Sequence, residues 1–174
     1  MIRKLHIGAN VESLTWEVFN IVPADYVDHI GNAKNLSRFK NNTFSEIYAS
    51  HVIEHFDYVN ELEVALKEWY RVLNKNGKIY VSVPDMEILA QLFLSKNELT
   101  LDERFFVMRI IFGGHENEYD YHFMGFNKDL LVHYLTKAGF VNIQKVENFG
   151  LFEDASVAWF KNVPISLNMT ANKI

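Results

Sequence analysis

The stretch YASHVIEHF, residues 48–56, places ionisable side chains where a strand gives way to the next element. Apolar residues lead into it, and His51, Glu54 and His55 follow. Imidazole titrates near neutral pH, so it can accept a proton from a hydroxyl or an amine. If the strand belongs to an open parallel sheet, its carboxyl end lies where ligands bind. We therefore expect His51 to contact a cofactor or substrate, with a histidine that merely ends the strand as the alternative. For His55 the pattern favours a structural role beside the next helix.

A second polar cluster occurs in GGHENEYDYHFMG, residues 113–125. Its glycines, carboxylates and two histidines have the composition of a loop that carries function. His122 is a candidate general base for an acceptor hydroxyl. A metal ion held by His115, His122 and a carboxylate is the competing hypothesis, but the spacing matches no compact ligand motif, so we expect no metal site. A solvated loop without chemistry is the remaining alternative.

The segments that must position these residues alternate between strand and helix patterns. Strands are predicted at 4–8, 16–21, 44–50, 78–85, 140–147 and 163–171, with a weaker one at 26–30. Helices are predicted at about 60–77, 86–95, 100–112 and 127–138, the first with Asn60 and Glu63 as a capping box and Gly77 as its stop. This alternation implies crossovers between parallel strands. We predict the α/β class with a doubly wound sheet in one domain, residues 1–174.

Composition excludes several classes of function. The 174 residues are 49% apolar and 22% charged with a net charge of -5, and no run of lysine or arginine suits nucleic acid or an anionic membrane. Cysteine is absent, which excludes disulfides, thiolate metal sites and cysteine nucleophiles. No apolar run has the length of a signal peptide or a membrane span, so the expected compartment is the cytoplasm.

Residues 44–85 resemble the middle of the class I S-adenosylmethionine-dependent methyltransferases in three pieces: SHVIEHF, KEWYRVLNKNG and KIYVSVPD. In that family a fourth strand ends in hxxVLEH, and a helix reading xExxRVLKPGG leads to the fifth strand. The later YDYHFMGF is similar to YDxHxxGF in a subgroup of predicted methyltransferases. The resemblance implies a Rossmann-like, mostly parallel seven-stranded sheet and S-adenosyl-L-methionine as cofactor. It places cofactor-binding residues at Gly8, Ala9, Asn32, Ala33, Ser50 and His51.

The front of the chain departs from the family pattern. The family has a GxGxG turn after strand one, whereas this chain has Gly8 followed by Ala9 and Asn10. Val22-Pro23 stands where an acidic residue binds the ribose, with Asp25 as a late substitute. About eight residues separate the first two strands, too few for a helical crossover, so the first helix is predicted to be shortened or missing. We therefore expect weak or absent cofactor binding relative to glycine-complete relatives.

The leading hypothesis is a methyltransferase-like protein acting on a small-molecule or glycan acceptor, with His122 or His51 as the base. The alternative is a non-catalytic binding or scaffold protein that keeps the fold without the cofactor. A metal-dependent hydrolase on the same sheet ranks last. The acceptor and the oligomeric state do not follow from the sequence.

Overall fold

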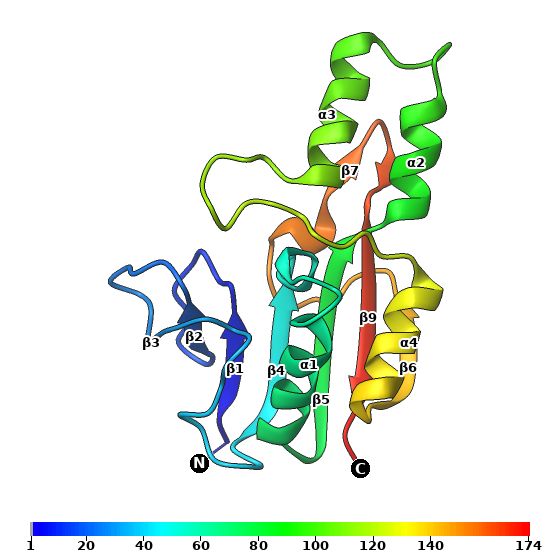
Figure 1. The fold of residues 1–174 in the computed structure, drawn as a ribbon. Coiled ribbons are helices and arrows are strands. Elements are labelled where there is room, and N and C mark those ends of the chain that lie inside the picture. Colours follow the sequence, from blue (N-terminus) through cyan, green and yellow to red (C-terminus); the bar gives the residue numbers. More distant parts are fainter. Residues whose placement is uncertain (1) are drawn as a thin grey trace.

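Seven strands form the central sheet in the order β3-β2-β1-β4-β5-β9-β6 (Figure 1). The computed structural model describes residues 2–174. The sheet strands are β1 (Lys4–Ile7), β2 (Glu17–Asn20), β3 (His29–Ile30), β4 (Phe44–Ser50), β5 (Leu73–Pro84), β6 (Val141–Val146) and β9 (Ser166–Asn172). The helices are α1 (Leu62–Val72), α2 (Met86–Leu94), α3 (Leu101–Phe112) and α4 (Lys128–Ala138), with 3₁₀ turns η1 (Ile53–His55) and η2 (Ala155–Val157). A separate hairpin pairs β7 (Trp159–Phe160) with β8 (Val163–Pro164).

The first five strands pair in parallel, whereas β9 runs antiparallel to both β5 and β6. No helix lies between β1 and β2. The predicted α/β class, the mostly parallel seven-stranded sheet and the missing first helix are confirmed. The parallel strands bring the carboxyl ends of β1, β2, β4 and β5 to one edge, where a ligand site is expected.

Helices α1 and α4 lie side by side on one face of the sheet (Figure 1). Helix α1 buries one stripe of residues at helical spacing: Leu62, Ala65, Leu66, Trp69 and Val72. This stripe packs against alternate strand residues such as Ile47 and Ile79. The confirmed order of β4, α1 and β5 places the turn that follows β4 at the carboxyl edge.

The ends of α1 differ from the prediction. The helix begins after Glu61, whose carboxylate accepts from the backbone N–H of Asp57 at 3.0 Å, and no Asn60 capping box forms. It ends at Val72 rather than near Gly77, because residues 73–77 already belong to β5. The Lys173 ammonium, from the far end of the chain, donates to the carbonyls of Tyr70 and Leu73 at 2.8 Å each. A distant residue thus stabilises the end of the helix.

On the other face of the sheet, a loop rather than a helix covers β1, β4 and β5. His6, Tyr48 and Tyr80 point to this face and contact the aromatic rings of Phe149 and Phe152. This loop therefore fills part of the space that crossover helices occupy in a doubly wound sheet.

Helices α2 and α3 extend beyond the carboxyl edge of the sheet and form a small core of their own with Leu89, Val107 and Ile165 (Figure 1). The predicted strand at 163–171 is split into β8 and β9, because Ile165 enters this small core and its N–H donates to the Ala158 carbonyl. After α3 the chain returns across the edge, where the N–H groups of Phe123 and Met124 donate to the Glu54 carbonyl. None of the helices in residues 2–174 is long and apolar enough to cross a membrane.

Candidate functional site

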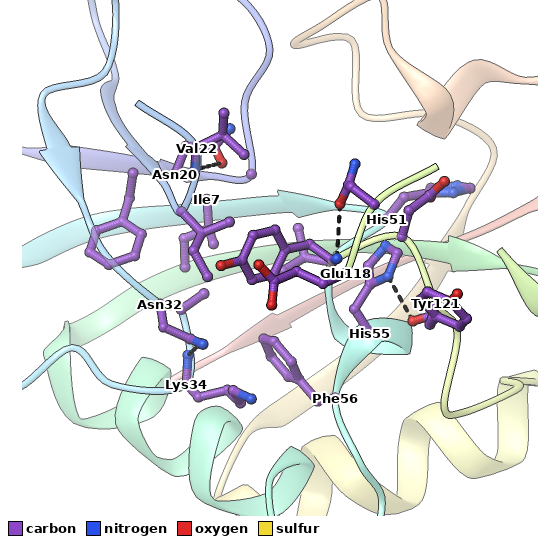
Figure 2. Close-up of a pocket in the computed structure, with 18 of the residues that line it drawn as sticks. Ile7, Asn20, Val22, Asn32, Lys34, His51, His55, Phe56, Glu118 and Tyr121 are labelled. Atoms are coloured by element: carbon purple, nitrogen blue, oxygen red, sulfur yellow. Dashed lines mark hydrogen bonds between the residues drawn. The ribbon is translucent and has the colours of Figure 1, made fainter. Parts of the chain in front are cut away.

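A cavity of about 780 Å³ opens at the carboxyl ends of β1, β2 and β4 (Figure 2). Its volume lies in the range of roughly 300–1,000 Å³ that is usual for small-molecule sites. The strand ends provide one wall, and the segment 116–123 provides the opposite wall. In Figure 2, Asn20, Val22, Asn32 and Lys34 lie on one side, and His51 and His55 lie on the other.

Gly8, immediately after β1, is required by the backbone and by packing. Its φ is +78°, and a Cβ atom there would lie 2.6 Å from Val52 Cγ2. Its N–H donates to the Phe19 carbonyl at 2.8 Å, which ties the turn to the end of β2. The positive φ and the contact with Val52 therefore explain why one glycine of the family turn is present. Asn10 also lines this part of the cavity.

Asn20, the last residue of β2, lines the cavity near the position of the family's acidic residue. Its Nδ2 donates to the Ala9 carbonyl at 2.8 Å, and its Oδ1 accepts from the Val22 N–H at 3.1 Å. A carboxylate has no proton to give the Ala9 carbonyl, so this turn favours an amide. Sequence reasoning missed Asn20 because it extended the strand by one residue. Asp25, its suggested substitute, does not line the cavity.

The loop after β3 brings Asn32 and Ala33 to the cavity, as expected for both. The Asn32 Oδ1 accepts from the Lys34 N–H at 3.0 Å, and the Ala33 carbonyl accepts from Trp69 Nε1 at 2.8 Å. Two other candidates lie elsewhere. Ala9 is buried behind the cavity wall, and Ser50 donates to Asp154 at 3.2 Å on the loop-covered face of the sheet.

Glu54 is a functional candidate to which the sequence analysis assigned no role. It lies in η1, its side chain is fully buried, and neither carboxylate oxygen has a hydrogen-bond partner among residues 2–174. Burial raises the pKa of Glu54 to about 8. The EH pair marked this position as part of a motif, but only the tertiary structure shows that its carboxyl group is buried without partners.

The hydrogen bonds around His51, just after β4, determine which ring nitrogen carries the proton. Its Nε2 lies 3.0 Å from Ser166 Oγ, and that hydroxyl donates its own proton to the Ala155 carbonyl at 2.7 Å. His51 Nε2 must therefore donate, which leaves a lone pair on Nδ1, 3.5 Å from Glu54 Oε1. Burial, and secondarily His122, lowers the pKa of His51 to about 4, so the ring is neutral at pH 7.

His55 and His122 lie next to this carboxyl group. Their ring centroids are 4.7 Å apart at an interplanar angle of 76°. His55 Nδ1 lies 3.0 Å from the Tyr121 carbonyl, and Figure 2 shows this contact. Burial lowers the pKa of His55. Burial, and secondarily the neighbouring His55, lowers the pKa of His122 to about 4. The two candidate bases therefore both lie near Glu54, but only His51 lines the cavity and His122 does not.

His115 does not belong to the close group of Glu54, His55 and His122. Its ring stacks on Tyr121 with centroids 4.0 Å apart, and its Nε2 lies 2.9 Å from the Phe112 carbonyl. Among the described residues, the close group of metal-binding atoms contains His122 but not His115, which the competing metal hypothesis placed together.

The charged residues around the cavity are mostly acidic. Five carboxylates line it, against one lysine: Asp57, Glu61, Glu116, Glu118 and Asp120, with Lys34. Lys34 is itself paired with Glu61 at 2.6 Å. Such a lining attracts a cationic ligand more than an anionic one.

The comparisons with known proteins agree with this geometry. A family described as a methyltransferase domain matches residues 12–81. The resemblance to the class I S-adenosylmethionine-dependent methyltransferases is confirmed. S-adenosyl-L-methionine is the cofactor that the family match supports. No curated protein sequence matches the chain.

Solved structures of methyltransferases share the fold. A possible histamine N-methyltransferase from Thermotoga maritima is 19% identical with a TM-score of 0.57, over 99% of this chain and 82% of that one. A methyltransferase from Archaeoglobus fulgidus is 14% identical with a TM-score of 0.60, over 99% and 86%. The CurJ carbon methyltransferase is 13% identical with a TM-score of 0.60, but the chain spans only 48% of its length. At these sequence identities, the similarity shows only that the folds are alike.

The cavity of this methyltransferase-like chain fits S-adenosylmethionine. The Gly8 turn leaves no room for a Cβ atom and brings backbone close to the cavity, and the acidic lining suits a sulfonium cation. Asn20, with one N–H and part of its carbonyl oxygen still free, offers hydrogen bonds to hydroxyl groups without a carboxylate's charge.

Proposed function

We propose that the protein transfers a methyl group from S-adenosylmethionine to a small-molecule or glycan acceptor. The observation that carries this proposal is the cavity of about 780 Å³ at the carboxyl ends of the parallel strands. It lies where this sheet topology binds ligands, and its volume suits a cofactor together with a small acceptor.

The residues of the strand ends are the proposed cofactor contacts. The backbone at Gly8 and Asn10 would hold the methionine part, Asn20 the ribose hydroxyls, and Asn32 with Ala33 the adenine. When bound, the cofactor supplies an electrophilic methyl group on a sulfonium cation. The chain's own contribution is to orient both reactants in the cavity and to limit the access of water.

The opposite wall is the proposed acceptor side. Tyr119, Tyr121 and Phe123 contribute aromatic surface there, and the carboxylates of the same segment add hydrogen-bond acceptors. His51 is the proposed base, because it lines the cavity and its ring is neutral at pH 7, so it can take the acceptor's proton. His122, the other candidate from the sequence, does not line the cavity. His51→Ala is expected to lower turnover by about 10²–10⁴-fold.

Ligand-induced stabilisation tests the proposal without a known acceptor. S-adenosylmethionine or S-adenosylhomocysteine at 100 times its dissociation constant should add about 2.7 kcal/mol to the unfolding free energy. Asn10→Trp should block the cavity and abolish this shift, because Asn10 is an exposed lining residue. Asn97→Trp, at an exposed position outside the cavity, is the matched control and should keep the full shift.

The alternative function predicts the opposite result. A scaffold that has lost the cofactor should show no shift with either ligand, and Asn10→Trp should then behave like Asn97→Trp. The cytoplasmic location and the lack of nucleic-acid and membrane partners stay predictions.

A further inference from the structure

Glu54, His55 and His122 each present a metal-binding atom, and these three atoms lie within 4.8 Å of one another. We infer that they form a binding site for a divalent transition-metal ion of the Zn²⁺ type. The inference does not depend on methyl transfer, since it rests on the arrangement of the three side chains. It differs from the ligand set considered from the sequence, in which His115 stood with His122.

The buried carboxyl group of Glu54 is the first argument. Its side chain is 0% exposed, and both oxygens lack a hydrogen-bond partner among residues 2–174. A buried carboxylate without donors or a counter-charge is costly, so such groups are usually paired or coordinate a metal. A cation between Glu54 and the two imidazoles would provide the missing partner.

The hydrogen bond of His55 is the second argument. The Tyr121 carbonyl can only accept, so His55 carries its proton on Nδ1 and keeps a lone pair on Nε2. Metal-binding histidines typically donate their second N–H to a carbonyl or carboxylate in this way.

The third argument is the fit of distances and ligand types. Zinc binds imidazole nitrogen at about 2.0–2.1 Å and carboxylate oxygen at about 2.0–2.2 Å, so tetrahedral ligand atoms lie about 3.4 Å apart. Atoms already within 4.8 Å need side-chain movements of only about 1 Å. Two histidines and one glutamate suit zinc, cobalt or iron(II) better than magnesium or calcium, which prefer oxygen ligands alone.

The site would lie at the wall of the cavity. His55 belongs to the site and also lines the cavity, as does His51, whose Nδ1 lone pair is 3.5 Å from Glu54 Oε1. His51 is thus placed to accept a hydrogen bond from a metal-bound water or to become a fourth ligand. A three-residue set with one open position is the arrangement of catalytic rather than structural zinc sites.

Titration of the full-length, metal-stripped protein with Zn²⁺ by calorimetry tests the inference, and Co²⁺ absorption reports the coordination. We expect one ion per chain. His122→Ala and the isosteric Glu54→Gln should each weaken Zn²⁺ binding about 100-fold or more and abolish the Co²⁺ ligand-field bands. His115→Ala, in the same loop, and His133→Ala, on the surface of α4, should bind as the unaltered chain does. Circular dichroism confirms that each variant is folded.

Two results would overturn the inference. One is no Zn²⁺ binding by the unaltered chain, in which case Glu54 is a buried neutral acid. The other is equal affinity in Glu54→Gln and His133→Ala, which would place the ion elsewhere. Zn²⁺ binding and the cofactor-induced shift are separate measurements, so failure of one leaves the other interpretable.

Discussion

Replacing Gly8 with alanine tests whether the turn after β1 is as constrained as its geometry indicates. An alanine at φ +78° costs about 1–2 kcal/mol for the left-handed backbone alone. The new Cβ would also lie 2.6 Å from Val52 Cγ2, well inside the 3.5–4.0 Å of a normal carbon contact. Relieving such overpacking costs about 1–3 kcal/mol. The expected loss of unfolding free energy is therefore about 2–5 kcal/mol.

A double-mutant cycle separates the two contributions. Val52→Ala removes the atom that clashes, so Gly8→Ala in that background should cost only the backbone part, about 1–2 kcal/mol. Gly150 is the matched control, because its φ is +65° but a Cβ there would meet nothing closer than Asn148 Oδ1 at 4.0 Å. Gly150→Ala should likewise cost only about 1–2 kcal/mol.

Urea unfolding monitored by fluorescence and circular dichroism measures these differences, provided both probes give the same transition. For a chain of this length, about 2–5 kcal/mol lowers Tm by about 4–20 °C. The reasoning fails if Gly8→Ala costs no more than Gly150→Ala, or if Val52→Ala leaves the cost of Gly8→Ala unchanged. Either result would mean that the turn rearranges without strain.

Three further predictions concern stability and the cofactor. Burial lowers the pKa of His6 to about 4 from an ordinary 6.5, so the unfolded chain binds more protons between these values. His6 should therefore contribute a loss of up to about 3 kcal/mol of stability as pH drops from 6.5 to 4, in addition to the losses from His51 and His122, and His6→Phe should remove the His6 contribution in denaturant titrations. Tyr48→Phe removes hydrogen bonds to Asp154 at 2.9 Å and Ser156 at 3.1 Å, so the unfolding free energy should drop by about 1.5–3 kcal/mol. An unchanged denaturant midpoint would show that these hydrogen bonds do not stabilise the fold. S-adenosylmethionine should bind with a dissociation constant above the low-micromolar range in calorimetry, since the proposed ribose contact, Asn20, is neutral. A low-micromolar or smaller dissociation constant would contradict this prediction.

Local patterns were enough to predict most elements of the fold. The apolar run at 44–50 is a buried parallel strand, and the helical periodicity of residues 62–72 places five side chains in the core. Gly139 ends α4 in the left-handed conformation with φ +105°, as its position after residues 127–138 indicated. These features depend on residues a few positions apart, whose spacing is visible in any stretch of sequence.

The candidate site depended on contacts that sequence spacing does not encode. Whether His122 or His115 meets the strand end was decided by how the chain returns after α3, where backbone N–H groups bond the Glu54 carbonyl. The end of α1 is stabilised by Lys173, about a hundred residues away. From the sequence alone, residues 48–56 indicated ionisable groups at the carboxyl edge of a parallel sheet. Only the packing of residues 113–126 over that edge buries Glu54, which has no hydrogen-bond partner in the described part of the chain, because burial is a property of the surrounding chain and not of the residue itself.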